Sequence, residues 1–343
     1  MKPKVFVCQP VPAVAIDRMR EHAEVEIFPF SHRPISIGEL ESAARRSDYI
    51  FCMHETPVTA SIAEANPHLK GFALGRAHPE IVDIEACKRV GVPLLEANSV
   101  ARRGDEARAP ARGHATSDLM VAHILNLAYR VIEADRYCRR NGYWQERTIA
   151  LEGLGTTDKT CSLIGFGRVA RGAVATLHGI GMKVLYTKRT RLDEREEQAL
   201  GVEWVGDRDE LIHRGDFVCM CVNYQPENHK LMGAREFALM KPTAYFINVG
   251  RGRLVDEEAM IAALKDGTIA GAGLDVYYSE PPTSVDPYIP DALREMENVT
   301  LTPHNGGATW DHRGPMTLAI ANVIVEDILA RNLAASSEPV EVH

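Results

Sequence analysis

A glycine-rich turn in the middle of the chain has the residue types that bind phosphate groups. An apolar run leads into Gly165 and Gly167 and then into alanine-rich sequence, which predicts a strand, a tight turn and a helix. Gly165 would let the backbone reverse, and Gly167, which lacks a Cβ, would let a dinucleotide pyrophosphate approach the N-terminal end of the helix. By itself, a G-x-G-x-x-A match predicts a turn without a ligand about equally well. The predicted cofactor contacts at this turn are Gly165, Phe166, Gly167, Arg168 and Val169.

The residues expected to meet the adenosine ribose are basic. Lys188 stands 23 residues after Gly165 (188 − 165), close to the spacing of a Rossmann unit, and Arg189 and Thr190 follow it. An NAD-specific site places Asp or Glu there, and that carboxylate repels a 2′-phosphate. Two cations and a hydroxyl would instead bind the phosphate, so NADP(H) is predicted as the preferred cofactor and NAD(H) as the second choice. A solvated basic turn is the alternative interpretation.

The elements that must position these residues alternate between strands and helices. This alternation runs to about residue 98 and resumes after the glycine-rich turn, which predicts parallel sheets covered on both faces. We therefore predict an α/β fold with two Rossmann-like, doubly wound parallel-sheet domains and an active-site cleft between them. Residues 1–98 plus 312–343 would form a flavodoxin-like substrate-binding domain, and residues 99–311 a dinucleotide-binding Rossmann domain.

Two segments depart from that alternation. Residues 99–115 carry four arginines without apolar periodicity, which predicts a surface loop. Ser117 would cap a long, widely apolar helix from Asp118 to about Arg140, in which His123 is predicted to be a hydrogen-bonded core histidine. The last helix is predicted from about Arg313 to Arg331. The strands predicted after the glycine-rich turn are Met182–Tyr186, Phe217–Val222, Ala244–Asn248, Gly271–Val276 and Val299–Leu301.

Composition argues against several classes of function. The 343 residues carry a formal net charge of −8, which gives no reason to expect a nucleic-acid or membrane surface. No apolar run reaches the ~18 residues that a membrane span requires. Seven scattered cysteines without C-x-x-C pairs or neighbouring histidine ligands favour reduced thiols in a cytoplasmic protein and predict no metal site.

Three polar residues each follow a predicted strand in the second half of the chain. Arg251 lies in Asn-Val-Gly-Arg-Gly-Arg, Glu280 in Tyr-Tyr-Ser-Glu-Pro, and His304 in Leu-Thr-Pro-His-Asn-Gly-Gly. With these motifs the sequence resembles, over nearly its whole length, the D-isomer-specific 2-hydroxyacid dehydrogenases, in particular the glyoxylate/hydroxypyruvate reductase-like members. In that family such an arginine, glutamate and histidine form the catalytic set, with the first two 29 positions apart, as here (280 − 251).

The resemblance implies an oxidoreductase that reduces a 2-oxo acid to the D-2-hydroxy acid by hydride transfer. The reaction leaves negative charge on the carbonyl oxygen, which His304 would protonate because its ordinary pKa lies near neutrality. Glu280 would hold the imidazole ring and favour its protonated form. Arg251 would bind the substrate carboxylate and polarise the carbonyl with its planar, permanently charged guanidinium.

Further expectations follow from the resemblance alone. Asp275 would approach the nicotinamide carboxamide, and Asp256 is either a site residue or a helix cap. The long helix after residue 117 resembles the dimer-forming element of the family, so a homodimer is expected. Asn223 and Pro226 would contact the cofactor from the end of a strand that runs under it. Gly307 would lie in a loop beside the nicotinamide ring.

The turn expected to bind the substrate carboxylate departs from the family pattern. Many members have a G-x-G turn there, whereas this chain has Arg76 and His78 in place of the glycines. A guanidinium facing a carboxylate, phosphate or phosphonate explains such an arginine, so the substrate is predicted to carry a second anionic group. The predicted substrate contacts are His54, Arg76, Ala77, His78 and Arg251.

Two other functions stay open at this stage. The family also includes dinucleotide-sensing corepressors, which bind partners, and enzymes that oxidise small acids such as phosphite and formate. The complete set of Arg251, Glu280 and His304, and the absence of long disordered tails, count against a corepressor-like binding protein.

Overall fold

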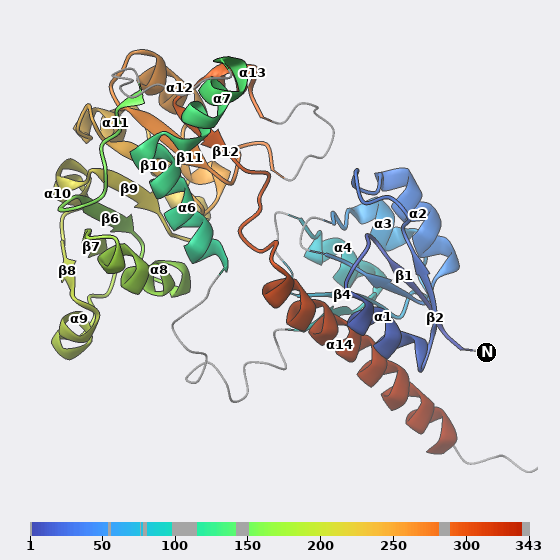
Figure 1. Ribbon diagram of the computed structural model, residues 1–343. Helices are drawn as coiled ribbons and strands as arrows, with labels where there is room; N and C mark the ends of the chain where they lie inside the picture. Colours follow the sequence, from blue (N-terminus) through green and yellow to red (C-terminus); the bar gives the residue numbers. More distant parts are fainter. Residues whose placement is uncertain are drawn as a thin grey trace, which may run out of the picture. The chain divides into compact units, whose positions relative to one another are not determined.

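The computed structural model describes residues 2–53, 56–75, 77, 81–97, 115–141, 151–280 and 289–337. The chain forms two compact units, unit 1 from Met1–Ala109 with Thr309–His343 and unit 2 from Pro110–Ala308 (Figure 1). Each unit contains a parallel sheet flanked by helices, which confirms the predicted α/β fold. Within these described ranges, no helix combines the length and the apolar character needed to cross a bilayer.

Unit 1 is built on one parallel sheet. Its strands are β1 (Lys4–Val7), β2 (Glu24–Ile27), β3 (Tyr49–Phe51), β4 (Gly71–Leu74) and β5 (Leu94–Glu96), in the order β2-β1-β3-β4-β5. The helices between them are α1 (Ala13–Arg20), α2 (Ile37–Arg46), α3 (Ala60–Glu64) and α4 (Ile84–Val90). Ser36 begins α2 with a capping box, in which the Ser36 hydroxyl accepts from the Glu39 amide while the Glu39 carboxylate accepts from the Ser36 amide. Local sequence thus fixes where this helix begins.

Helix α14 (Trp310–Ser337) belongs to unit 1 although it comes last in the chain. Its Ile320, Ile324 and Ile328 are buried in a cluster with α1 and the strands. Its Asp327 accepts a hydrogen bond of 2.6 Å from the Tyr49 hydroxyl, which ties the helix to β3. The predicted helix, Arg313–Arg331, was too short at both ends. The helix continues through Pro315 in its second turn, where the missing amide proton removes one hydrogen bond of the helix.

Unit 2 is built on a larger parallel sheet. Its strands are β6 (Thr160–Ile164), β7 (Lys183–Thr187), β8 (Val202–Trp204), β9 (Phe217–Met220), β10 (Tyr245–Asn248), β11 (Gly271–Leu274) and β12 (Val299–Leu301), in the order β12-β11-β10-β9-β6-β7-β8. Its helices are α6 (Ala115–Tyr129), α7 (Val131–Asn141), α8 (Arg168–Gly179), α9 (Glu194–Leu200), α10 (Arg208–Arg214), α11 (Ala234–Leu239), α12 (Glu257–Lys265) and α13 (Asp291–Glu295). Two short 3₁₀ turns are η2 (Pro226–Asn228) and η3 (Gly252–Leu254).

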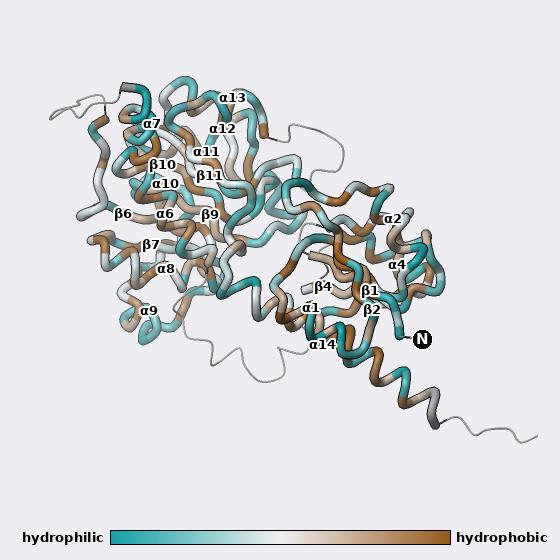
Figure 2. The backbone as a smooth tube through the Cα atoms, turned by 45° about the vertical axis from the view of Figure 1, so that its right-hand side comes forward, coloured by the Kyte–Doolittle hydropathy of each residue, from teal (hydrophilic) through white to brown (hydrophobic). Residues whose placement is uncertain are grey.

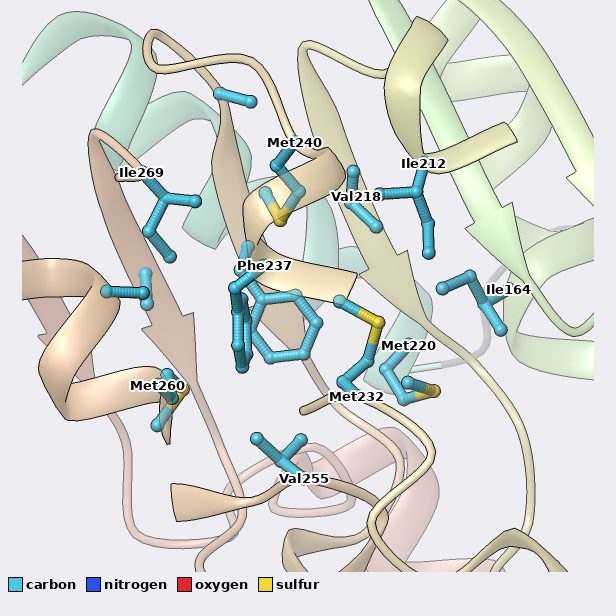
Figure 3. Packing of buried hydrophobic residues seen from close by; sticks show 14 of the residues in the cluster. Ile164, Ile212, Val218, Met220, Met232, Phe237, Met240, Val255, Met260 and Ile269 are labelled. Carbon is cyan, nitrogen blue, oxygen red and sulfur yellow. The ribbon is translucent and has the colours of Figure 1, made fainter. Parts of the chain in front are cut away.

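Both faces of this second sheet are buried. Val218 of β9 belongs to one apolar cluster and Cys219 to the other, because successive side chains of a strand point to opposite faces. Residues of α10, α11 and α12 complete the first cluster, and residues of α6 and α8 complete the second. Figure 3 shows Phe237 of α11 in the middle of the first cluster. Figure 2 shows apolar residues along the strands, as expected for a sheet covered on both faces.

The order of the strands reverses beside β6. Strands β7 and β8 lie on one side of β6, whereas β9 to β12 lie on the other. In open parallel sheets, ligands bind beyond the carboxyl ends of the strands at such a reversal. The glycine-rich turn follows β6 directly, so the fold puts this turn at the position where a ligand is expected.

The single long helix predicted from Asp118 to Arg140 is wrong. The structure has two helices, α6 and α7, separated by Arg130 in the left-handed conformation with φ of 52°. The Arg130 guanidinium pairs with Glu133 of α7, and this ion pair holds the break without a glycine or proline. Ser117 is not a cap but lies inside α6. The sequence also failed to predict strand β8, which is only three residues long.

Candidate active site

The turn after β6 has the geometry predicted for a pyrophosphate site. Gly165 has φ of 92°, and a Cβ there would lie 2.5 Å from Val222 Cγ1, so glycine is required. Gly167 precedes α8, whose first turn receives no side-chain cap, and a Cβ at Gly167 would meet no atom within 4 Å. Uncapped amides at a helix N-terminus with open space beside them fit an anionic group. The described residues therefore fit the diphosphate of a dinucleotide.

The other residues predicted at this turn differ in the exposure of their side chains. Phe166 is buried against Tyr186, with ring centroids 4.4 Å apart, so its side chain belongs to the core. Arg168 is exposed at the start of α8. The Val169 carbonyl accepts a hydrogen bond of 2.7 Å from the Ser117 hydroxyl, which fastens α8 to α6. Val169 packs against the apolar core, so among these predicted residues Arg168 alone has an exposed side chain.

The polar residues that follow β7 differ in their side-chain contacts: one of them is paired with a carboxylate, and a group of three is unpaired. Arg191 donates to Glu197 at 2.9 and 2.7 Å, and its guanidinium lies over the Trp204 ring at 5.2 Å from the centroid. The hydrogen bond from Arg191 is the main cause that lowers the pKa of Glu197 to about 2. In the part of the chain that the structure describes, the unpaired group makes no side-chain hydrogen bond or ion pair. This group consists of Lys188, Arg189 and Thr190.

His304 and Glu280 meet beyond the carboxyl ends of β12 and β11. The Nδ1 atom of His304 lies 2.9 Å from Glu280 Oε2, and Glu280 Oε1 accepts a hydrogen bond of 3.3 Å from the Tyr277 amide. Burial lowers the pKa of His304, but the hydrogen bond and the charge of Glu280 together outweigh burial, so the pKa is raised above its ordinary value of 6.5. Because Glu280 occupies Nδ1, a proton given to a substrate would come from Nε2.

Arg251 lies on the loop after β10, next to the loop that carries Glu280. A Cβ at Gly252 would overlap the backbone carbonyl of Tyr277, so only glycine lets these two loops touch. The charge of Arg251 lowers the pKa of His304, but Glu280 raises it by more. The structure therefore brings the three predicted catalytic residues together on neighbouring loops of unit 2.

Asp275 organises the loop that carries His304. It is buried, and its Oδ1 accepts hydrogen bonds from the Thr302 hydroxyl at 2.6 Å and from the Asn305 amide at 2.5 Å. Its Oδ2 accepts from the Gly306 amide at 3.0 Å, and its backbone carbonyl accepts from the His304 amide at 2.9 Å. Both carboxylate oxygens are thus engaged within the protein, and the contact with the nicotinamide carboxamide stays a prediction.

The remaining predicted residues of unit 2 lie at the same edge of the sheet. Asn223 and Pro226 follow β9, and Gly307, half-buried, follows the His304 loop. Asp256 is the N-cap of α12, where it accepts from the Ala259 amide at 3.3 Å. The cap interpretation of Asp256 is therefore confirmed.

Most of the substrate contacts predicted in unit 1 fall outside the described residues. His54, Arg76 and His78 lie outside them, and so does the arginine-rich stretch from 99 to 114. Ala77 is described, and its amide donates to Glu96 Oε1 at 2.7 Å. The Ala77 amide is therefore already hydrogen-bonded within the protein.

Two residues that hold the site were missing from the sequence prediction. The Asn248 side chain accepts from the Gly250 amide at 3.0 Å and donates to the Arg251 carbonyl at 3.1 Å, which fixes the turn that carries Arg251. The Thr302 hydroxyl holds Asp275, as described above. Each is a polar residue at the end of an apolar strand, two or three positions before a catalytic candidate, and that position is the signal that could have identified them.

Comparisons with known proteins agree with this geometry. Residues 121–306 match the family model described as D-isomer specific 2-hydroxyacid dehydrogenase, NAD binding domain. A glyoxylate reductase of Thermococcus gammatolerans is 36% identical over 98% of this chain and 93% of its own length. A second, from Thermococcus onnurineus, is 34% identical over the same shares, 98% and 93%.

Solved structures show the same similarity. A structure from Polaromonas sp., described as a D-isomer specific 2-hydroxyacid dehydrogenase, matches with a TM-score of 0.79 and 25% identity over 97% of this chain and 98% of that chain. A protein from Thermus thermophilus matches with a TM-score of 0.77 and 28% identity over 95% and 97% of the two chains. The chain thus belongs to the D-isomer specific 2-hydroxyacid dehydrogenases, oxidoreductases that reduce a 2-oxo acid to a 2-hydroxy acid with a nicotinamide dinucleotide.

Proposed function

We propose that this chain reduces a small 2-oxo acid to the D-2-hydroxy acid with NADPH as the preferred reductant. The observation that carries the proposal is the 2.9 Å contact between His304 Nδ1 and Glu280 Oε2, which favours a protonated imidazole. Together with Arg251 on the adjoining loop, it offers a proton donor and a cation for the substrate carboxylate. We assign dinucleotide binding to residues 99–311 and substrate binding to residues 1–98 plus 312–343.

The proposed mechanism assigns one task to each of the three residues. NADPH, when bound, supplies the hydride that turns the carbonyl carbon into an alcohol carbon. His304 gives the Nε2 proton to the substrate oxygen as negative charge develops there. Glu280 keeps its hydrogen bond to Nδ1 and so stabilises the imidazolium before the transfer. Arg251 binds the substrate carboxylate through its planar fork, a geometry that lysine lacks.

The preference for NADP(H) rests on the segment after β7. Lys188, Arg189 and Thr190 offer two cations and a hydroxyl that no described residue engages. Arg191 beside them is already paired with Glu197. The chain has no Asp or Glu from 187 to 192, where an NAD-specific site would need a carboxylate for the ribose hydroxyl. A 2′-phosphate would therefore supply the negative charge that these two cations lack as a partner.

The relatives named glyoxylate reductase support a small substrate, and we propose glyoxylate as one substrate. Its single carboxylate needs only one cation, the role given to Arg251. Arg76 and His78 replace glycines of the family pattern and support a better substrate with a second anionic group. Oxidation of phosphite or formate is the alternative chemistry.

We also propose a homodimer formed through α6 and α7. Tyr129 and Val131, at the junction of the two helices, are 55% and 50% exposed, and a second copy would cover these large apolar side chains. The cysteines in the described residues are free thiols, which supports the predicted cytoplasmic location.

A substrate comparison tests the function. We would measure kcat/KM for glyoxylate, pyruvate, oxaloacetate and a phosphonate-bearing 2-oxo acid with NADPH and with NADH, and the oxidation of phosphite and formate with NADP⁺. We expect reduction of the 2-oxo acids, faster with NADPH by about tenfold or more, and fastest for the doubly charged compounds. Turnover of phosphite or formate alone would overturn the proposed reaction. Equal kcat/KM with NADH and NADPH would overturn the cofactor preference only.

A further inference from the structure

A buried chain of hydrogen bonds connects helix α6 to the loop that carries His304. His123 of α6 is 2% exposed, its Nε2 lies 3.1 Å from Thr302 Oγ1, and its Nδ1 lies 2.7 Å from Thr300 Oγ1. Thr302 Oγ1 donates to Asp275 Oδ1 at 2.6 Å. Asp275 in turn accepts from the amides of the His304 loop. His123 therefore lies at the inner end of a continuous path to the proposed proton donor.

The direction of these hydrogen bonds defines the tautomer of His123. The Thr302 hydroxyl gives its proton to Asp275, so its oxygen accepts from Nε2–H of His123. In a neutral ring Nδ1 then carries no proton and accepts from the Thr300 hydroxyl. Burial lowers the pKa of His123, which keeps the ring neutral. Nε2 of His123 thus donates to Thr302 and Nδ1 accepts from Thr300, and only the hydrogen bond at Nε2 connects the ring to Asp275.

The backbone around His123 is shaped to receive its ring. A Cβ at Gly273 of β11 would lie 2.8 Å from His123 Cβ and 3.0 Å from its Cγ and Nδ1, so a side chain at 273 would displace the imidazole. At the start of the same helix, the Thr116 hydroxyl donates to the Gly306 carbonyl at 3.1 Å. Helix α6 therefore holds the His304 loop at two points, Thr302 and Gly306.

The loop needs such support because His304 has a backbone conformation that side chains rarely adopt. Its φ is 53°, in the left-handed region. Conformations of this kind persist where the surrounding structure enforces them. We infer that His123 is a positioning residue for His304, acting through Thr302 and Asp275. This inference rests on the proposed role of His304 as the proton donor.

Two substitutions of similar size separate positioning from simple packing. The amide nitrogen of Gln reaches about as far as Nε2 of histidine, whereas that of Asn reaches only as far as Nδ1. We expect His123→Asn to lower kcat for 2-oxo acid reduction by roughly five- to tenfold, the effect of one lost buried hydrogen bond. His123→Gln should recover most of that loss, because it can still donate to Thr302. The Kd for NADPH should change less than kcat in either variant, because the hydrogen bonds of the His123 ring go to Thr300 and Thr302. The proposed dinucleotide contacts at the glycine-rich turn and at residues 188–190 are untouched, although Asp275 and Gly307 are predicted to lie beside the nicotinamide.

The pH profile supplies a readout that packing alone would not move. If the loop shifts, the His304 ring moves away from Glu280 and loses the contact that raises its pKa. The fall of kcat/KM for reduction at high pH should then begin at a lower pH in His123→Asn than in the wild-type protein. The pKa of His304 in the variant, measured by NMR titration of the protein without substrate, should also be lower than in the wild-type protein. This measurement does not require turnover.

A matched control is Ser162→Ala. Ser162 is fully buried in the same unit, and its hydroxyl donates to the Leu211 carbonyl at 2.8 Å, away from the His304 loop. This variant should lose thermal stability but keep the wild-type kcat and pH profile. Equal behaviour of His123→Asn and His123→Gln, or a similar change of kcat and pH profile in Ser162→Ala, would overturn the inference. A wild-type protein that reduces no 2-oxo acid would instead overturn the proposed function. The NMR comparison of the His304 pKa in the wild-type protein and His123→Asn would still test the connection through Thr302 and Asp275.

Discussion

The acid loop, residues 302–306, and the basic segment, residues 188–190, both follow strands of the same sheet but are held differently. Three successive amides of the acid loop, those of His304, Asn305 and Gly306, donate to Asp275. In contrast, no described residue pairs with the side chains of the basic segment. The protein therefore positions its proposed proton donor by itself, whereas we expect the proposed cofactor to order the basic segment. Changes in the acid loop should affect kcat, and changes in the basic segment should affect cofactor selectivity.

Removal of the proposed proton donor should have the largest effect. His304→Gln keeps a polar side chain but cannot provide the proton, so kcat for reduction should fall by roughly 10²–10⁴-fold. Steady-state assays with NADPH and glyoxylate measure this loss. Fluorescence titration with NADPH should give a Kd close to that of the wild-type protein. A variant with near-normal kcat would show that the proton comes from another group.

Removal of the two cations of the basic segment should have the next largest effect. Lys188→Ala combined with Arg189→Ala should lower kcat/KM with NADPH by about 10²-fold, because charged hydrogen bonds to the phosphate are lost, and should leave the value with NADH almost unchanged. The control is Arg191→Ala, which removes a cation that Glu197 already engages. It should lower thermal stability without changing the ratio of the two cofactors. A double variant with an unchanged ratio would speak against the phosphate site.

A side chain at residue 252 should disturb the contact between the catalytic loops. Gly252→Ala would push its Cβ into the Tyr277 backbone, so we expect a loss of about 1–3 kcal/mol in the free energy of unfolding and a lower kcat. Gly179→Ala, at the end of α8, is the control, because a Cβ there would meet nothing within 4 Å. Urea titrations compare the two. Equal stability of both variants would mean that the loops are not in close contact.

The smallest effect on chemistry is expected at the proposed dimer contact. Tyr129→Asp with Val131→Asp places charges at the exposed α6–α7 junction and should shift the protein from dimer to monomer in sedimentation experiments. Because both side chains are exposed, the stability of the fold should change by only about 0.5 kcal/mol. A wild-type protein that sediments as a monomer would refute the dimer.

The sequence predicted those parts of the fold that depend on local patterns. Strand β12 has the predicted bounds, since its apolar run stops at a proline motif, and the turn at Gly165 follows from the glycines. The helix break at Arg130 could not be predicted from the local sequence. Arginine favours helix interiors, and the left-handed conformation at this residue is stabilised by its pairing with Glu133.

The candidate site divides in the same manner. Arg251, Glu280 and His304 could be named from their motifs, because residues just after parallel strands gather at one edge of a sheet. The inward orientation of Asp275 could not be named, since its partners Thr302 and Asn305 come from a loop 27 and 30 residues further along the chain. Contacts between distant segments depend on packing, which one sequence does not display.

The pH dependence of reduction in the wild-type protein and in Glu280→Gln tests the proposed proton donor most directly. In the proposed mechanism, reduction requires protonated His304; burial lowers its pKa, but Glu280 raises it by more, so that it lies above 6.5. In the wild-type protein, kcat/KM for the 2-oxo acid with saturating NADPH should therefore fall as pH rises through a pKa above 6.5. In Glu280→Gln the charge is gone while burial and Arg251 still lower the pKa, so the fall should move to a lower pH. The same high-pH fall in both proteins would contradict the assignment of His304 and Glu280 as the acid pair.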